Sequence, residues 1–196
     1  MCMNKWPIEI INDGNKILNN IFNKENNITP SKENVLKFLK MNPHEIKVVI
    51  LGQDPYPRRG VANGRAFAVS LDTPIPMSLK NIFSEVKEIQ GTIITNETLQ
   101  HWEDNGVLML NTSLTTNVGE SNAHKKYWGK YTQSIIEFLD ATINPLFVLW
   151  GRQAQSYESM IKNSKISKDF HPSPFSNHLR DGKSMKDIIS ILEIQL

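Results

Sequence analysis

The chain has 196 residues, 39% of them hydrophobic and 21% charged, with a formal net charge of +2 at pH 7. This length suits one domain with a well-buried core and is too short for two ordinary domains. The sequence has no apolar run long enough to cross a membrane, no secretion signal and a single cysteine, Cys2, which excludes disulfides and thiolate metal sites. We expect one monomeric, soluble, cytoplasmic domain over residues 1–196 (in the host cell if the source is viral), without metal or cofactor.

Residues 1–45 are expected to form the N-terminal helical part of this domain. The helical spacing of apolar residues is interrupted at residues 12–14 and 26–29, so the sequence predicts breaks there. Pro30 suits the first turn of the next helix, where a missing N–H removes no hydrogen bond. The apolar stripe of that helix comprises Val35, Leu36 and Leu39. We interpret both helices as packing elements.

The first predicted strand is the apolar run Val48–Leu51, whose composition is typical of a strand covered on both faces. The motif Gly52-Gln53-Asp54-Pro55-Tyr56-Pro57 follows it directly. Each proline biases the preceding residue away from the helical region, so the carboxylate and the aromatic ring are held stiffly. Ligands of open α/β sheets bind at this end of the strands. The alternative is a turn that merely contains aspartate, a common turn residue.

Loops and helices are predicted between this strand and the next. Residues 64–70 have an extended, small-residue pattern, and residues 72–77 form a proline-stiffened loop. Ser78 is predicted to cap a helix, and such a helix start offers hydroxyl and amide donors to a phosphate, although most bind nothing. A short helix over residues 99–105 is closed by Gly106.

Three further strands are predicted, joined by helices. They are Val107–Leu110, Pro145–Trp150 and the weaker Lys165–Phe170, and the last helix is centred on residues 185–192. Residues 115–129 are predicted to be a polar loop, in which we interpret His124 as solvated. Alternating strands and helices indicate an α/β fold, a three-layer αβα sandwich with a central, mostly parallel four-stranded sheet.

Basic residues cluster at two places in the chain. One group follows the first strand and comprises Arg58, Arg59 and Arg65; the other surrounds the last strand and comprises Lys162, Lys165 and Lys168. Such groups are usually solvated faces. They would indicate an anionic polymer as partner only if both flanked one cleft.

Parallel strands would bring Asp54, Asn111 and His171 together at one edge of the sheet. Without a serine or cysteine in a nucleophile position, these residues favour water-directed chemistry. A carboxylate can orient water and stabilise a sugar cation, an imidazole can stabilise a leaving anion, and an amide can read a planar ring. Phe67 or Tyr56 would stack on that ring. This suits cleavage of an N-glycosidic bond, although in isolation His171 could be structural and Phe67 core.

Four motifs resemble those of the family 1 uracil-DNA glycosylases and stand in the same order. They are Gly52–Tyr56, Leu108–Asn111, Leu149–Gly151 and His171–Pro174. The resemblance covers roughly residues 45–180 and implies a monofunctional glycosidase of base excision repair. Such an enzyme flips uracil out of damaged DNA and hydrolyses its N-glycosidic bond, leaving an abasic site.

The resemblance also implies a role for individual residues. Asp54 would orient the attacking water and His171 would stabilise the uracil anion. The residues implied to bind uracil are Gln53, Tyr56, Phe67 and Asn111. Those implied to contact DNA are Pro57, Ser78, Gly151, Ser173 and Phe175, with Phe175 as the wedge that fills the gap left by the flipped base.

The sequence departs from the family pattern at two of these positions. Pro57 stands where histidine is usual, as in the poxvirus branch, and Phe175 stands where leucine is usual. The alternative is therefore a non-catalytic DNA-binding or replication-accessory protein that keeps the fold. A glycosylase with another base preference is a further alternative, and a DNA-mimicking inhibitor protein is a possible partner beside uracil-containing DNA.

Overall fold

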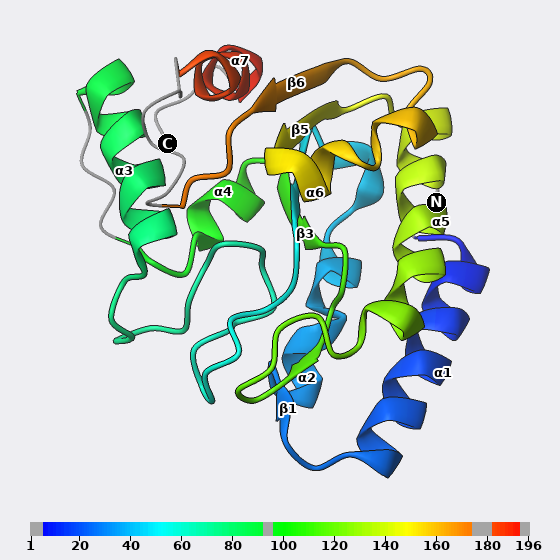
Figure 1. Ribbon diagram of the computed structural model, residues 1–196. Coiled ribbons are helices and arrows are strands. Elements are labelled where there is room, and N and C mark those ends of the chain that lie inside the picture. The colour runs from blue at the N-terminus through cyan, green and yellow to red at the C-terminus, as the bar shows by residue number, and fades with distance from the viewer. Residues whose placement is uncertain (1–5, 92–95, 174–181, 193–196) are drawn as a thin grey trace.

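The computed structural model describes residues 6–91, 96–173 and 182–192, and within them four strands form one parallel sheet between two layers of helices (Figure 1). The strand order is β3-β2-β5-β6. The strands are β2 (Val48–Gly52), β3 (Val107–Asn111), β5 (Leu146–Trp150) and β6 (Ile166–Asp169). All three neighbouring pairs are parallel, so the predicted fold class is confirmed.

Alternate side chains of the central strands enter two separate hydrophobic cores. Val49 and Leu51 face the core shared with α1 (Ile8–Lys24) and α5 (Lys125–Thr142). Val48 and Ile50 face the opposite core, which is completed by α3 (Met77–Gln90), α4 (Gln100–Asp104) and α7 (Lys183–Leu192). Because every residue of β2, β3 and β5 is buried, the sheet holds their carboxyl ends rigidly in register.

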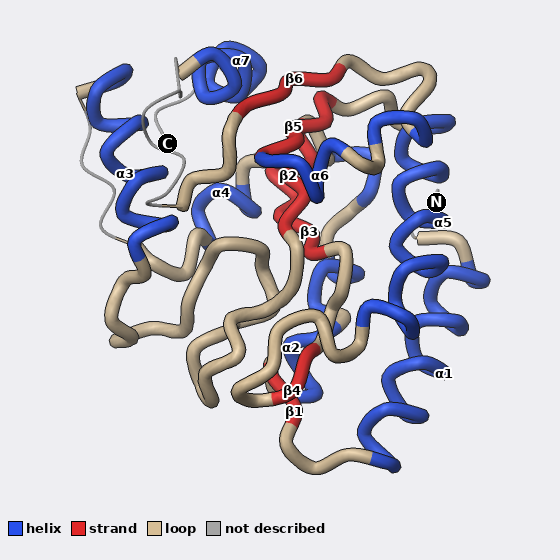
Figure 2. The backbone as a smooth tube through the Cα atoms, in the orientation of Figure 1, coloured by secondary structure: helices blue, strands red, loops and turns tan. Residues whose placement is uncertain are grey.

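Shorter elements connect these layers. They are α2 (Lys32–Val35), the 3-10 helices η1 (Lys37–Lys40), η2 (Pro43–Glu45) and η3 (Glu158–Met160), and α6 (Gly151–Gln155). A second, antiparallel sheet pairs β1 (Ile28–Thr29) with β4 (Thr116–Asn117), well apart from the main sheet (Figure 2). This small sheet ties the N-terminal segment to the loop that follows β3.

Four expectations about local structure are wrong. The first helix runs without a break through residues 12–14, and Pro30 precedes α2 instead of opening it. The extended pattern predicted for residues 64–70 is interrupted at Phe67, whose φ is +65°, and only an isolated bridge joins Ala62 to Val69. The segment 115–129 is not all loop, because β4 lies within it and α5 begins at Lys125.

The uninterrupted first helix has a tertiary cause. A Cβ atom at Gly14 would lie 2.4 Å from the Tyr131 hydroxyl oxygen, so glycine allows α1 and α5 to approach closely. The turn-forming residues before Gly14 are overruled by this packing. In the described part of the chain, the helices are all too short or too polar to span a membrane.

Candidate active site

A pocket of about 210 Å³ opens at the carboxyl ends of β2 and β3. It brings together most of the site residues predicted from the sequence: Gln53, Asp54, Tyr56, Pro57, Phe67, Ser78, Asn111 and His171. Gly151 lines an adjoining cavity of about 160 Å³ that shares Gln53, Phe67 and His171 with the first. Ser173 lies two residues after His171, and its backbone N–H donates to the His171 ring. Phe175 falls outside the described residues.

Asp54 lies two residues after the end of β2 and is partly buried. The backbone N–H of Asn122 donates to its Oδ2 atom at 2.7 Å. Burial raises the pKa of the Asp54 carboxyl above its ordinary value of 3.8, and hydrogen bonds from Asn122 and the Gln53 side chain oppose that increase. These hydrogen bonds favour the charged carboxylate, which is the form that can accept a proton from water.

Asn111 ends β3 opposite Gly52 of β2 and is 5% exposed. A Cβ atom at position 52 would lie 2.3 Å from the Asn111 Oδ1 atom and 2.6 Å from the Ala66 Cβ atom. Gly52 therefore makes room for the amide at the pocket. The two strand ends are also linked beyond the sheet, because the Thr112 hydroxyl donates to the Gln53 carbonyl at 2.9 Å.

The Tyr56 hydroxyl holds the backbone of Phe67. It donates to the Phe67 carbonyl at 2.9 Å, so the Ser78 hydroxyl, 3.0 Å away, donates in turn to the Tyr56 oxygen. Phe67 has a positive φ of 65°, which is uncommon for a bulky residue and requires such support. Ser78 does not cap the helix as predicted, because α3 begins at Met77, after Pro76. Ser78 lines the pocket instead.

His171 follows β6 and contacts the ring of Phe67 at a centroid distance of 5.7 Å. The Ser173 N–H donates to its Nδ1 atom at 3.1 Å. In a neutral imidazole the proton therefore lies on Nε2. A Cβ atom at Gly151 would lie 2.8 Å from that of His171, so glycine is needed for the close approach. Asn81 of α3 donates to the Pro172 carbonyl at 2.8 Å and anchors the segment.

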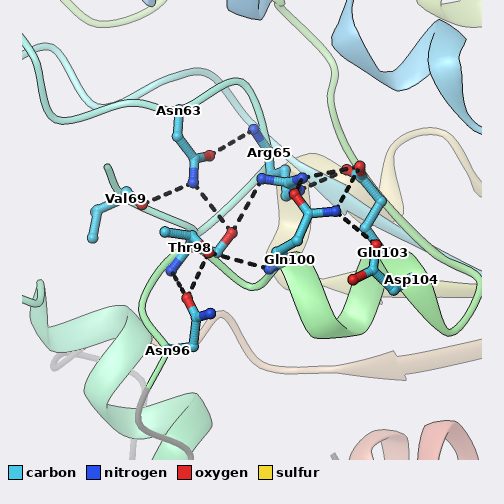
Figure 3. Close-up of polar contacts among 8 residues, drawn as sticks. All are labelled: Asn63, Arg65, Val69, Asn96, Thr98, Gln100, Glu103 and Asp104. Atoms are coloured by element: carbon cyan, nitrogen blue, oxygen red, sulfur yellow. Dashed lines mark hydrogen bonds and ion pairs between the residues drawn. The ribbon is translucent and has the colours of Figure 1, made fainter. Parts of the chain in front are cut away.

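A polar cluster surrounds the buried side chains of Asn63 and Arg65 (Figure 3). Arg65 is 7% exposed and forms two hydrogen bonds with Glu103 of α4, at 2.6 and 2.9 Å. Asn63 accepts from the Arg65 N–H at 3.0 Å and donates to the Val69 carbonyl at 2.8 Å. These bonds fix both ends of the loop that carries Phe67. Arg65 thus does not belong to an exposed basic cluster with Arg58 and Arg59, as the sequence suggested.

His124 also differs from its prediction. It is 1% exposed instead of solvated, and its ring nitrogens lie 2.8 Å from the Thr115 hydroxyl and 3.0 Å from a Glu25 carboxylate oxygen. Sequence reasoning missed the partners Glu25, Glu103 and Asn122. No local pattern marks them, because each contacts a residue 38 to 99 positions away.

Comparison with known proteins agrees with this geometry. The model of the uracil DNA glycosylase superfamily matches residues 39–193. The chain belongs to this superfamily. This match confirms the resemblance to uracil-DNA glycosylases that the four sequence motifs indicated.

Relatives within the uracil-DNA glycosylases include bacterial and viral proteins. The uracil-DNA glycosylase of Clostridium perfringens is 43% identical over 159 residues, which is 78% of this chain and 71% of the relative. That of Geobacillus sp. is 44% identical over 155 residues, covering 76% and 69%. The crystal structure of mimivirus uracil-DNA glycosylase has a TM-score of 0.77 and 28% identity, covering 88% of this chain and 71% of that one.

Proposed function

We propose that this chain is a monofunctional uracil-DNA glycosylase that removes uracil from DNA and leaves an abasic site. The observation that carries the proposal is the single pocket in which Asp54, Asn111 and His171 meet the rings of Tyr56 and Phe67. These residues come from three different strand ends and two loops, and the chain belongs to the uracil-DNA glycosylase superfamily.

In the proposed reaction, the Asp54 carboxylate orients a water molecule toward C1′ of the flipped nucleotide and stabilises the developing sugar cation. The bond from C1′ to N1 breaks, and its electron pair leaves with uracil. The Nε2–H of His171 donates to uracil O2 as negative charge builds there. The water oxygen bonds to C1′ and loses a proton to the carboxylate.

Specificity for uracil would come from Asn111, whose amide can accept from uracil N3–H and donate to O4. Cytosine presents the reverse pattern at these atoms and leaves the buried amide mispaired. Phe67 would stack on the base, Gln53 would contact uracil O2, and Tyr56 would lie against C5, where a thymine methyl does not fit. The base reaches the pocket by flipping out of the stack.

We further propose that Pro57, Ser78, Gly151, Ser173 and Phe175 contact the DNA around the flipped nucleotide. The Ser78 hydroxyl already donates to Tyr56, so a phosphate oxygen would bond elsewhere on this helix start or replace that partner. A mimivirus relative was crystallised in complex with UGI, which supports a DNA-mimicking inhibitor as a partner of this chain as well. With DNA as substrate, we propose a cytoplasmic site of action.

The test is release of free uracil from a single-stranded and a double-stranded oligonucleotide, measured side by side. We expect Asp54→Asn and His171→Leu each to lower kcat by about 10²- to 10³-fold, because each removes a group that stabilises transition-state charge. The matched controls are Asp13→Asn and His44→Leu, at exposed positions outside the pocket. Wild-type rates in either site variant would overturn the assignment. Binding of uracil-DNA by the wild-type chain without base release would instead support the accessory-protein alternative.

A further inference from the structure

The loop between β4 and α5 supplies the backbone donor to Asp54. Asn122 in this loop has a positive φ of 61°, a conformation that asparagine tolerates better than most residues. Its N–H reaches Asp54 Oδ2 at 2.7 Å, and the neighbouring Ser121 lines the pocket. The position of the carboxylate therefore depends on what holds this loop.

Backbone hydrogen bonds hold the near end of the loop. The Gly119 N–H donates to the Pro57 carbonyl at 2.7 Å, and the Val118 N–H donates to the Asn27 carbonyl at 2.8 Å. At the far end, the Ala123 N–H donates to the Thr116 hydroxyl at 3.2 Å and the Lys125 N–H donates to the Asn122 carbonyl at 3.2 Å. Contacts between side chains add to these bonds. His124, the last residue before α5, is buried between the Thr115 hydroxyl and Glu25, which directly follows α1.

For a neutral His124 the hydrogen bonds around the imidazole run in one direction. The Trp128 Nε1–H donates to the Thr115 hydroxyl oxygen at 2.6 Å, and an indole cannot accept in return. The Thr115 proton is then directed to His124 Nδ1, 2.8 Å away. The Nε2–H donates to Glu25, 3.0 Å away, a carboxylate that can only accept. A protonated imidazole would donate from Nδ1 as well, and the Thr115 proton would then have to leave this chain.

The groups around Glu25 favour its ionised form. The hydrogen bond from His124 lowers the pKa of the Glu25 carboxyl more than any other contact does, against the opposing effect of burial. A hydrogen bond from Asn117 and the nearby His124 and Lys126 add smaller decreases. Tyr127 of α5 packs against the imidazole at a centroid distance of 5.9 Å. Glu25 is thus the ionised acceptor at the end of the series of hydrogen bonds that begins at Trp128.

We propose that His124, held by Glu25 and Thr115, is a positioning residue for Asp54: it fixes the loop whose Asn122 N–H aims the water-orienting carboxylate. The proposal deepens the proposed function and rests on it for the role of Asp54. His124 itself does not line the pocket and touches no reacting atom.

The first test measures uracil release by the full chain with His124→Phe and Glu25→Ala. We expect kcat to fall by about tenfold or more, with little change in KM, because the carboxylate is misaimed while the base-binding residues stay in place. Glu25→Gln keeps an acceptor for Nε2–H and should retain most of the rate. His44→Phe, at an exposed histidine of η2, is the matched control and should behave as wild type.

The second test separates positioning from a general loss of structure. Losing the Asn122 bond removes a contact that lowers the pKa of Asp54, so the titration of this carboxyl should move to higher pH. The other ionisable groups facing this pocket are Tyr56, Arg65 and His171. Carboxyl ¹³C NMR would follow Asp54 in wild type, Glu25→Ala and Glu25→Gln. A lower kcat with an unchanged titration would overturn the proposal, as would unchanged values of both.

The third test does not depend on turnover. Imidazole ¹⁵N NMR of the wild-type chain should show the Nε2 atom of His124 protonated, because it faces the Glu25 carboxylate. A ring with its proton on Nδ1 and none on Nε2 would overturn the proposal. If the wild-type chain released no uracil, the proposed function would fail, while the two NMR measurements would still decide whether His124 positions Asp54. If His124→Phe does not fold, Glu25→Ala is compared with wild type in its place, because the Glu25 side chain is partly exposed and its loss disturbs the core less.

Discussion

The amide of Asn111 has room beside the pocket because residue 52 has no side chain. A Cβ atom there would lie 2.3 Å from the amide oxygen and 2.6 Å from the Cβ atom of Ala66. Contacts this short force a neighbour to move, and the amide is the more mobile of the two. Its orientation is what the proposed recognition of uracil requires.

Gly52→Ala should therefore impair catalysis more than folding. We expect kcat/KM for uracil release to fall by at least about tenfold, since a displaced amide misplaces the base. Steady-state assays with a thermal unfolding curve on the same sample would measure both properties. Gly129→Ala is the control, because a Cβ atom there has no neighbour within 4 Å. An unaltered rate in Gly52→Ala would show that the amide does not need its present position.

At the scale of single residues, the sequence predicted the site residues at the strand ends but not the residues that hold them in position. Asp54, Asn111 and His171 were identifiable because parallel strands direct their carboxyl ends to one edge. Asn122 acts through its backbone N–H, which no residue type reveals. Glu103 and Glu25 resemble any surface glutamate in sequence and are assigned a role only by partners far along the chain.

Among the elements, α5 and the turn before β6 are joined by one buried carboxylate. Asp140, 3% exposed, accepts the backbone N–H groups of Lys162, Asn163 and Ser164 at 2.8 to 3.2 Å. Burial opposes ionisation, but these donors lower the pKa of the Asp140 carboxyl below its ordinary value of 3.8 overall. The carboxylate thus accepts hydrogen bonds from three successive N–H groups of this turn and holds the turn against α5.

Asp140→Asn should lower the free energy of unfolding by about 2 kcal/mol at pH 7, since hydrogen bonds to a charged acceptor are lost. A carboxyl with a lowered folded-state pKa stabilises above the unfolded pKa, near 3.8, and loses that effect as pH falls through the folded value. The difference between wild type and variant should therefore shrink between pH 7 and pH 3. Urea titrations would measure it, with Glu137→Gln on the exposed face of α5 as control. A difference independent of pH would contradict this account.

Element boundaries were less predictable from the sequence than element order. The pattern located every strand of the main sheet to within about one residue, because a strand buried on both faces is continuously apolar. It failed where tertiary contacts overrule local preference. Gly14 is helical because Tyr131 packs over it, and residues 64–70 are irregular because Asn63 and Tyr56 hold Phe67 at a positive φ.

For the whole molecule, the alternation of strands and helices was sufficient to predict three layers, since right-handed crossovers place helices on both faces of a parallel sheet. How closely the helices of one layer approach each other depends on single atoms that the pattern does not contain. Gly14 and Tyr131 are one such contact between α1 and α5. The Tyr131 side chain is 4% exposed, and its hydroxyl has no hydrogen-bond partner among the described residues.

Tyr131→Phe should raise the free energy of unfolding by about 1 kcal/mol, because it removes a buried hydroxyl that gains no hydrogen bond on folding. Uracil release should not change, because Tyr131 does not line the pocket. Tyr56→Phe offers the opposite case: its hydroxyl bonds both the Phe67 carbonyl and Ser78, so the same chemical change should lower stability and activity together. Chemical denaturation and uracil-release assays on both variants would decide. A less stable Tyr131→Phe chain would mean that the hydroxyl has a partner, such as a buried water, and that the contact between α1 and α5 is polar.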